Sequence, residues 1–139
     1  MLIQYGVVPV RRSATGAVEI LLITSRETRR WVVPRGNPVP GRSAVESAAQ
    51  EAFEEAGIAG RTTAEPIGRY GYDKRRRDGR IVPAEVALFR MDVETIAESW
   101  PEMRERERRW FAVEAAATAV AEPALADIIR ALGPAVSRE

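Results

Sequence analysis

The amino-acid sequence predicts an α+β protein built on a mixed β-sheet. Four runs rich in β-branched and apolar residues predict strands, at residues 3–10, 17–24, 67–72 and 81–92. Start and stop signals predict a helix within residues 43–57, and a packing helix is expected at residues 123–132. Turn residues join the strands into hairpins without regular β-α-β alternation, which favours the α+β class.

The first two strands are predicted to form a hairpin, because Ser-Ala-Thr-Gly at residues 13–16 supplies turn chemistry between them. The consecutive apolar residues 20–23 predict a strand that is buried on both faces and lies centrally in the sheet. The first strand is also apolar. We therefore expect that it offers an edge through which a homodimer could form.

Composition limits the chemistry that this chain can perform. Its 139 residues, 45% of them hydrophobic, predict a single domain over residues 1–139 with its own core. The sequence has no cysteine and no histidine, which excludes disulfides, thiolate or imidazole metal ligands, and histidine bases. Any metal must therefore be held by oxygen atoms.

The charges are nearly balanced, with a formal net charge of +1, and this balance does not favour nucleic acid as a partner. The chain has no run of roughly 18 apolar residues and no signal-like opening, so we expect a cytoplasmic protein without a membrane partner. Basic residues do gather in short clusters, at residues 11–12, 29–30, 74–77 and 104–109. Together these clusters suit a polyanionic ligand.

The helix within residues 43–57 carries signals at both ends. Ser43 and Glu46 form a capping box at its start, and Gly57 supplies the residue just past its end. At about 100° per residue, one side of the helix is predicted to be apolar. That side is formed by Val45, Ala48, Ala49, Ala52, Phe53 and Ala56.

Three carboxylates, Glu51, Glu54 and Glu55, share another arc of this helix. Two interpretations are open: a solvated acidic face, or a site for a hard cation such as Mg²⁺ or Mn²⁺, which prefers carboxylate oxygens. The preceding loop favours the metal site. Its prolines and glycines at positions 34, 36, 38, 40 and 41 make it stiff and allow a backbone carbonyl to approach a metal.

This stretch resembles the Nudix box, the signature of Nudix hydrolases. The residues that match it are Gly36, Glu51, Ala52, Glu54, Glu55, Gly57 and Ile58. The lead-in at residues 30–36 and the stretch around Trp110 and Phe111 resemble Nudix enzymes of the diphosphoinositol polyphosphate and diadenosine polyphosphate type. The resemblance extends over about residues 1–135 and implies the Nudix fold, an α/β/α sandwich with a mixed sheet.

The resemblance implies a divalent-metal-dependent pyrophosphohydrolase acting on a nucleoside diphosphate linked to another moiety. Its implied substrate is a small phosphorylated molecule, most specifically a diphosphoinositol polyphosphate or a dinucleoside polyphosphate. Glu51, Glu54 and Glu55 would be catalytic and would bind Mg²⁺ or Mn²⁺, with the carbonyl of Gly36 as a further metal ligand.

For phosphate contacts we choose Arg26, Arg30 and Arg35, because these arginines are nearest in sequence to the glycine loop. An additional base could come from Glu105 or Glu107, since some family members supply one from this region. Surface ion pairing is the competing interpretation of both glutamates.

Two positions depart from the box. Arg42 stands where the family has a glutamate, and Gln50 stands where it has an arginine, so Gln50 can hydrogen-bond Glu54 but offers no charge. The alternative function is therefore a Nudix-fold module that binds a phosphorylated ligand with weakened catalysis. A third, an RNA 5′-end pyrophosphohydrolase, rests on the basic residues 74–80, which Asp78-Gly79 places at a hairpin tip.

Overall fold

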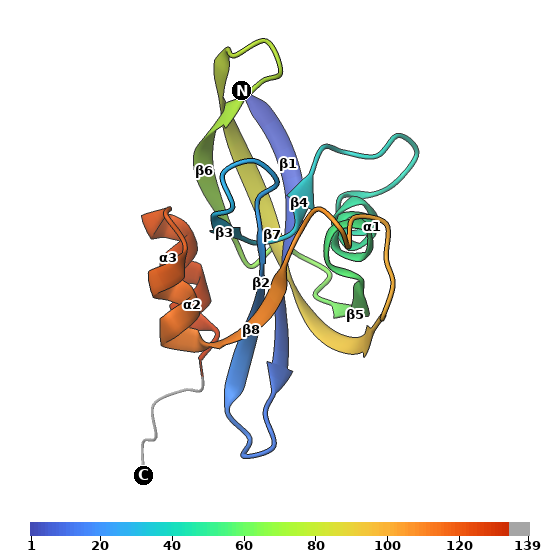
Figure 1. Ribbon diagram of the computed structural model, residues 1–139, viewed down its shortest axis with the longest axis vertical. Helices are drawn as coiled ribbons and strands as arrows, with labels where there is room; N and C mark the ends of the chain where they lie inside the picture. Colours follow the sequence, from blue (N-terminus) through green and yellow to red (C-terminus); the bar gives the residue numbers. More distant parts are fainter. Residues whose placement is uncertain (134–139) are drawn as a thin grey trace.

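The structure, a computed structural model, describes residues 1–133 (Figure 1). The strands are β1 (Leu2–Arg12), β2 (Val18–Thr24), β3 (Trp31–Val32), β4 (Arg35–Gly36), β5 (Ile58–Thr62), β6 (Gly68–Arg75), β7 (Ile81–Ile96) and β8 (Arg108–Ala112). The helices are α1 (Ala44–Ala56), α2 (Val113–Ala119) and α3 (Pro123–Ala131). The predicted strands and helices are all present. The end of the predicted 1–139 domain lies outside the described residues.

The strands form one mixed sheet in the order β3-β2-β1-β7-β5, with β4 paired to β1, β6 to β7 and β8 to β2. β1 runs parallel to β7, from the pair Leu2 and Ala84 to the pair Val10 and Asp92. The other pairings are antiparallel, including the predicted β1–β2 and β6–β7 hairpins. The mixed sheet predicted from the sequence is therefore confirmed.

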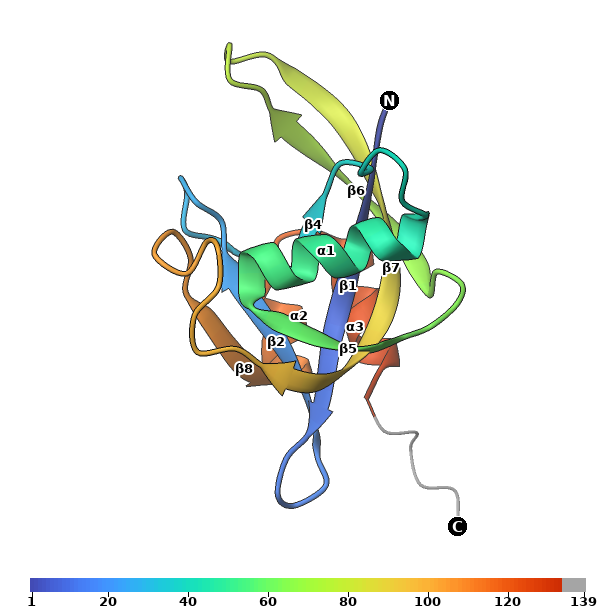
Figure 2. The same ribbon diagram turned by 90° about the vertical axis from the view of Figure 1, so that its right-hand side faces the viewer.

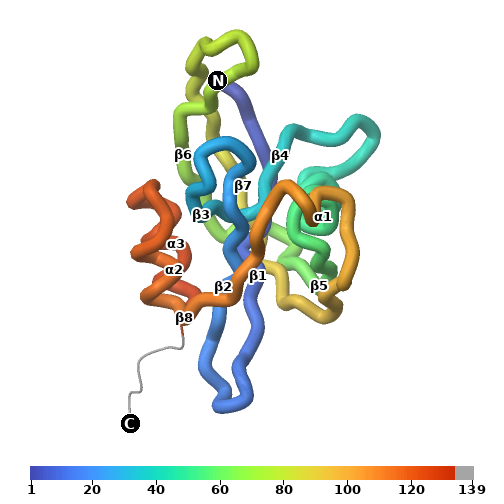
Figure 3. The backbone as a smooth tube through the Cα atoms, in the orientation of Figure 1, coloured from blue at the N-terminus to red at the C-terminus, as the bar shows by residue number. Residues whose placement is uncertain are grey.

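The expectation that the first strand offers a dimer edge is wrong. β1 has β7 on one side and β2 and β4 on the other, so it lies inside the sheet (Figure 3). Its apolar residues Val7, Val8 and Val10 are buried by the helices on the two faces of the sheet rather than by a second copy of the chain.

Helices cover both faces of the sheet, with α1 on one face and α2 and α3 on the other (Figure 2). Alternate residues of β2 enter the two layers: Ile20 and Leu22 pack with α2 and α3, whereas Leu21 and Ile23 pack with α1. The result is the expected α/β/α sandwich. Within residues 1–133, no helix is long and apolar enough to cross a membrane, and the cytoplasmic location stays a prediction.

The capping signals of α1 act as predicted. The Ser43 side chain accepts a hydrogen bond from the Glu46 backbone, the Glu46 side chain accepts one from the Ser43 backbone, and Gly57 closes the helix at φ 68°. On the predicted apolar side, Ala48, Ala52 and Ala56 are fully buried, whereas Phe53 is 44% exposed. It lies about 100° around the helix from the fully buried Ala52, which places it at the margin of the apolar arc.

The segment between β7 and β8 is fastened to the C-terminal end of α1. Trp100 donates its indole N–H to the carbonyl of Glu55 (3.1 Å), and Arg108 donates to the carbonyl of Ala56 (2.8 Å). The Arg108 guanidinium also stacks on the Trp100 ring, 3.7 Å from its centroid. These donors satisfy carbonyls that a helix end leaves without intrahelical partners.

We expect the substitution Gly57→Ala to destabilise the protein by more than the roughly 1–2 kcal/mol that a left-handed residue other than glycine costs. A Cβ at this position would lie 2.8 Å from atoms of the Trp100 ring, so the Trp100 segment would also have to move. The measurement is the free energy of unfolding from urea denaturation.

Gly16→Ala is the matched control. Gly16 has a φ of 87°, but a Cβ there would meet nothing within 4 Å, so this change carries only the backbone strain. Equal losses in the two variants would show that the contact between Gly57 and Trp100 contributes nothing.

Candidate functional site

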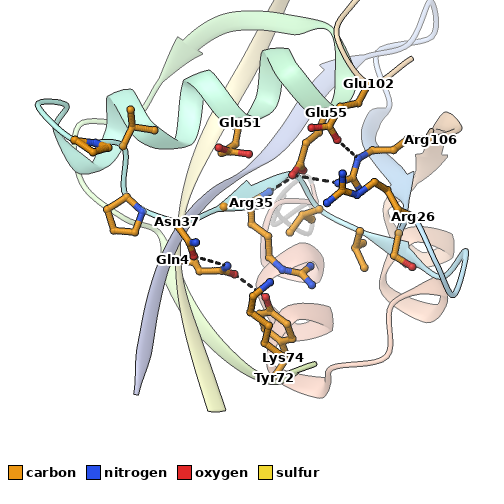
Figure 4. A pocket seen from close by; sticks show the side chains of 17 residues that line it. Gln4, Arg26, Arg35, Asn37, Glu51, Glu55, Tyr72, Lys74, Glu102 and Arg106 are labelled. Atoms are coloured by element: carbon orange, nitrogen blue, oxygen red, sulfur yellow. Dashed lines mark hydrogen bonds and ion pairs between the residues drawn. The ribbon is translucent and has the colours of Figure 1, made fainter. Parts of the chain in front are cut away.

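A cavity of about 470 Å³ opens between the loop after β4, helix α1, strand β6 and the segment before β8 (Figure 4). Its lining combines acidic, basic and neutral groups. The residues that line it are Gln4, Ser25, Arg26, Val32, Val33, Arg35, Gly36, Asn37, Pro38, Val39, Pro40, Glu51, Glu55, Tyr72, Lys74, Glu102 and Arg106. The tertiary structure therefore gathers segments from Gln4 to Arg106 around one space.

Gly36 lies directly against Glu51. β4 pairs with β1 at Tyr5 and Gly6, and this pairing holds the Gly36 backbone beside helix α1. A Cβ on Gly36 would overlap the Glu51 carboxyl group, within 2.6 Å of Oε1. Only glycine leaves room for that carboxylate. The backbone of the glycine loop at Gly36 therefore lies in contact with the Glu51 side chain of α1, the proximity that a shared site requires.

Glu55 is a buried carboxylate, with 8% of its surface exposed. Its Oε1 accepts a hydrogen bond from the backbone N–H of Arg35 (3.2 Å), and its Oε2 pairs with Nη2 of Arg106 (3.4 Å). Burial raises the pKa of Glu55 to about 8, and the neighbouring Glu51 raises it further, whereas Arg106 lowers it. Its surroundings in the metal-free protein therefore favour the neutral form of this carboxyl group more than water does.

Glu51 and Glu54 have different surroundings. Burial raises the pKa of Glu51, and the charge of Glu54 adds to the effect, so these two groups are close. Glu54 does not line the cavity; its Oε2 accepts a hydrogen bond from Gln50 (3.1 Å), the bond predicted from their spacing. At about 100° per residue Glu55 turns toward the sheet whereas Glu54 turns away from it.

The donors that are present fit a hard divalent cation. Carboxylate oxygens of Glu51 and Glu55 lie beside the Gly36 backbone, and no competing soft ligand is available because the sequence lacks cysteine and histidine. Within residues 1–133, no three acidic side chains already converge as a closed metal cluster.

The predicted phosphate-binding arginines do not all reach the cavity. Arg26 and Arg35 line it, but Arg30 is exposed and lies outside the lining. Arg35 is held in place: Nη1 donates to the Tyr70 hydroxyl (3.2 Å) and the guanidinium stacks on the Tyr72 ring at 4.0 Å. Because Arg35 also supplies the N–H that Glu55 accepts, one residue connects the acidic and basic sides of the site.

A hydrogen-bond chain steadies the loop on the far side of Arg35. The Tyr72 hydroxyl donates to Oε1 of Gln4 (2.7 Å), and Nε2 of Gln4 donates to Oδ1 of Asn37 (3.0 Å), as Figure 4 shows. Gln4 is almost fully buried. The residue that follows Gly36 is therefore anchored to two strands of the sheet.

Sequence reasoning missed three charged residues of the site: Glu102, Arg106 and Lys74. Lys74 and Arg106 belong to basic clusters that the sequence singled out, but no spacing rule placed them beside α1. Glu102 lines the cavity in place of the two glutamates considered for this segment. Glu105 pairs with Arg26 (3.2 Å) and Glu107 with Arg109 (3.1 Å), and all four of these side chains are substantially exposed.

We expect the stability of the metal-free protein to fall as pH rises from about 5 to 8. The folded-state pKa of Glu55, about 8, lies above the roughly 4.3 of an unfolded glutamate, so the native state binds this proton more tightly. The resulting stability is complete at acidic pH and is lost as pH rises through the folded pKa. Thermal melting between pH 5 and 9 measures it.

Two variants and a metal test this assignment. Glu55→Gln should flatten the pH dependence, whereas Glu46→Gln, at an exposed capping residue, should leave it intact. Because a cation binds the ionised form, Mn²⁺ should raise the melting temperature more at pH 8 than at pH 6. An unchanged pH dependence in Glu55→Gln would contradict the assignment.

Comparisons with known proteins agree with this geometry. The chain is 30% identical over 102 residues to Nudix hydrolase 12, mitochondrial, of Arabidopsis thaliana, an alignment that covers 71% of this chain and 50% of that protein. It is 32% identical over 99 residues to diphosphoinositol polyphosphate phosphohydrolase 3-beta of Bos taurus, covering 69% of this chain and 56% of that protein. The chain thus spans about half the length of these curated relatives.

The fold is also found among solved structures. The crystal structure of the C. elegans Ap4A hydrolase superimposes with a TM-score of 0.66 at 20% identity, covering 94% of each chain. The family model described as the NUDIX domain matches residues 3–132, which include α1, the glycine loop and both helices on the other face of the sheet. The chain therefore belongs to the NUDIX domain family.

Proposed function

We propose that this protein is a divalent-metal-dependent pyrophosphohydrolase that cleaves a nucleoside diphosphate linked to another moiety, or a related polyphosphate. One observation carries the proposal: Glu51 and Glu55 border the same cavity as the cations Arg26, Arg35 and Lys74. Carboxylates suit Mg²⁺ or Mn²⁺, and guanidinium and ammonium groups suit phosphate oxygens. A site with both kinds of group fits a polyphosphate that binds together with its metal.

The three helix carboxylates would hold Mg²⁺ or Mn²⁺, with the Gly36 carbonyl as a further oxygen donor. Glu51 and Glu55 line the cavity, and Glu54, outside the lining, accepts a hydrogen bond from Gln50. When bound, the cation would neutralise charge on the phosphoanhydride and acidify the attacking water. One of the carboxylates would orient that water or accept its proton.

Arginines would hold the phosphates on either side of the carboxylates. Arg26, in the segment after β2, lies beside Arg106, whereas Arg35 points toward Tyr72 and Lys74, as Figure 4 shows. Arg30, exposed outside the lining, would meet only a substrate that extends beyond the cavity. Lys74 adds a further cation at the same wall as Arg35.

For the substrate we propose a diphosphoinositol polyphosphate or a dinucleoside polyphosphate. Arg26, Arg35 and Lys74 line one cavity, and together these cations suit a ligand that carries several phosphate groups. The name of the bovine relative, a diphosphoinositol polyphosphate phosphohydrolase, supports the same class.

A substrate panel with Mg²⁺ or Mn²⁺ tests the class. We expect diphosphoinositol polyphosphates or dinucleoside polyphosphates to be hydrolysed with a higher kcat/KM than canonical or oxidised nucleoside triphosphates. Phosphate and nucleotide products would be quantified by chromatography. A preference for nucleoside triphosphates would reject this class while leaving pyrophosphohydrolysis itself intact.

Replacing Glu54 or Glu55 by glutamine should remove most of the turnover, on the order of 100-fold or more, because each change removes a charged oxygen ligand. Far-ultraviolet circular dichroism should report an unchanged fold. Glu46→Gln is the matched control on the same helix, since Glu46 serves the cap and lies away from the cavity. Full activity in Glu55→Gln would show that the acidic edge is only surface.

A second candidate is a Nudix-fold module that binds a phosphorylated ligand with weakened catalysis. It is favoured by Gln50, which is neutral and bonded to Glu54, and by Arg42 in place of a glutamate. Calorimetry would then detect binding of an inositol phosphate or nucleotide. Metal-stimulated phosphate release would be absent from the same preparation.

A further inference from the structure

Arg106 is a buried cation whose three guanidinium nitrogens all have partners. Nε donates to Oε1 of Glu102 (2.7 Å), Nη1 to the carbonyl of Thr24 (3.2 Å) and Nη2 to Oε2 of Glu55 (3.4 Å). Its side chain is 9% exposed. The guanidinium therefore joins helix α1, the end of β2 and its own segment at the wall of the cavity.

The backbone that carries Arg106 is fixed relative to α1. The amide of Glu102 donates to the carbonyl of Glu54 (3.0 Å), and Trp100 donates to the carbonyl of Glu55 (3.1 Å). On the other side, the backbone N–H of Glu107 donates to the Thr24 hydroxyl (2.8 Å). Arg106 is held from both directions along the chain, so its guanidinium is a rigid part of the site.

The other cations of the cavity have different contacts. Arg26 pairs with the exposed Glu105, and the Arg35 guanidinium bonds Tyr70 and stacks on Tyr72. Within α1, Gln50 bonds Glu54 and carries no charge. Among residues 1–133, the ion pair of Glu55 is formed with Arg106.

We propose that Arg106 is a positioning residue of this site. Held in place by its bond to Glu102, it fixes the orientation of the Glu55 carboxylate for binding the divalent cation. The inference rests on the proposed function for its consequence in catalysis. Each oxygen of the Glu55 carboxylate has two lone pairs. Oε2 accepts a hydrogen bond from Arg106 and Oε1 accepts one from the Arg35 N–H, so each oxygen retains a second lone pair for a metal.

The role depends on the shape of the guanidinium and not on charge alone. A planar fork can reach three acceptors in three directions, whereas a lysine ammonium is a single nitrogen on a flexible stem. Arg106→Lys would keep the charge but could not bond Thr24, Glu102 and Glu55 from one fixed position. This variant therefore separates orientation from electrostatics.

The test measures Mn²⁺ affinity by titration calorimetry and hydrolysis by steady-state kinetics. For Arg106→Lys we expect Mn²⁺ affinity and kcat each to fall roughly 10- to 100-fold, the usual effect of losing a residue that orients a metal ligand, with KM nearly unchanged. Arg109→Lys is the control, because Arg109 lies outside the cavity lining, pairs with the exposed Glu107 and stacks on Trp31 and Phe111. Wild-type Mn²⁺ affinity in Arg106→Lys would overturn the proposal.

A second pair of variants keeps the proposal testable if Arg106→Lys does not fold. Glu102→Leu is compared with Glu102→Leu/Arg106→Met, in which apolar groups replace the ion pair, a change that folds often tolerate. Weaker Mn²⁺ binding in the double variant than in the single one supports the role of Arg106, and equal binding overturns it.

The two readouts also separate this inference from the proposed function. Wild-type protein that binds Mn²⁺ but hydrolyses no polyphosphate would reject the proposed function, and the affinities would still decide the role of Arg106. If the wild type hydrolyses substrate and Arg106→Lys keeps the wild-type Mn²⁺ affinity and kcat, only the inference about Arg106 is rejected. Absence of Mn²⁺ binding to the wild type would overturn both.

Discussion

A buried carboxylate is stable only where hydrogen-bond donors reach its oxygens. Because Glu55 is buried, the fold must bring such donors to the side chain of this residue. The penalty for burying an uncompensated ion is several kcal/mol, so the backbone N–H of Arg35 and the guanidinium of Arg106 are structural requirements as much as functional ones. Meeting them requires the loop after β3 and the segment before β8 to converge on one turn of α1. The cavity exists because these three pieces of chain meet there.

The electrostatics of the site follow from the same convergence. Burial raises the pKa of both Glu51 and Glu55; the charge of Glu54 adds to the shift of the Glu51 pKa, and the charge of Glu51 adds to that of Glu55. A divalent cation would stabilise their charged forms, and the basic walls at Arg26 and Arg35 would face the phosphates. Opposite charges a short distance apart suit the two partners that we propose for the site, a cation and a polyanion.

Local signals predicted much of the fold because their causes are local. The capping box at Ser43, the left-handed Gly57 and the apolar run in β2 act within a few residues, and all three predictions were confirmed. Predictions that depended on distant neighbours were less successful. Phe53 lies at the margin of the apolar arc of α1 and is 44% exposed, and β1 is an internal strand because β7 pairs with it from a distant part of the sequence.

The sequence alone determined the helix, its carboxylates, the glycine that faces them and Arg35 on the loop, since spacing along one helix and one turn fixes these positions. Only the tertiary structure decided which carboxylate is buried and which cations meet it. Arg106 is 51 residues from Glu55 in sequence, and Tyr72 is 68 residues from Gln4. Contacts across such separations arise from strand pairing and loop docking, which no local periodicity encodes.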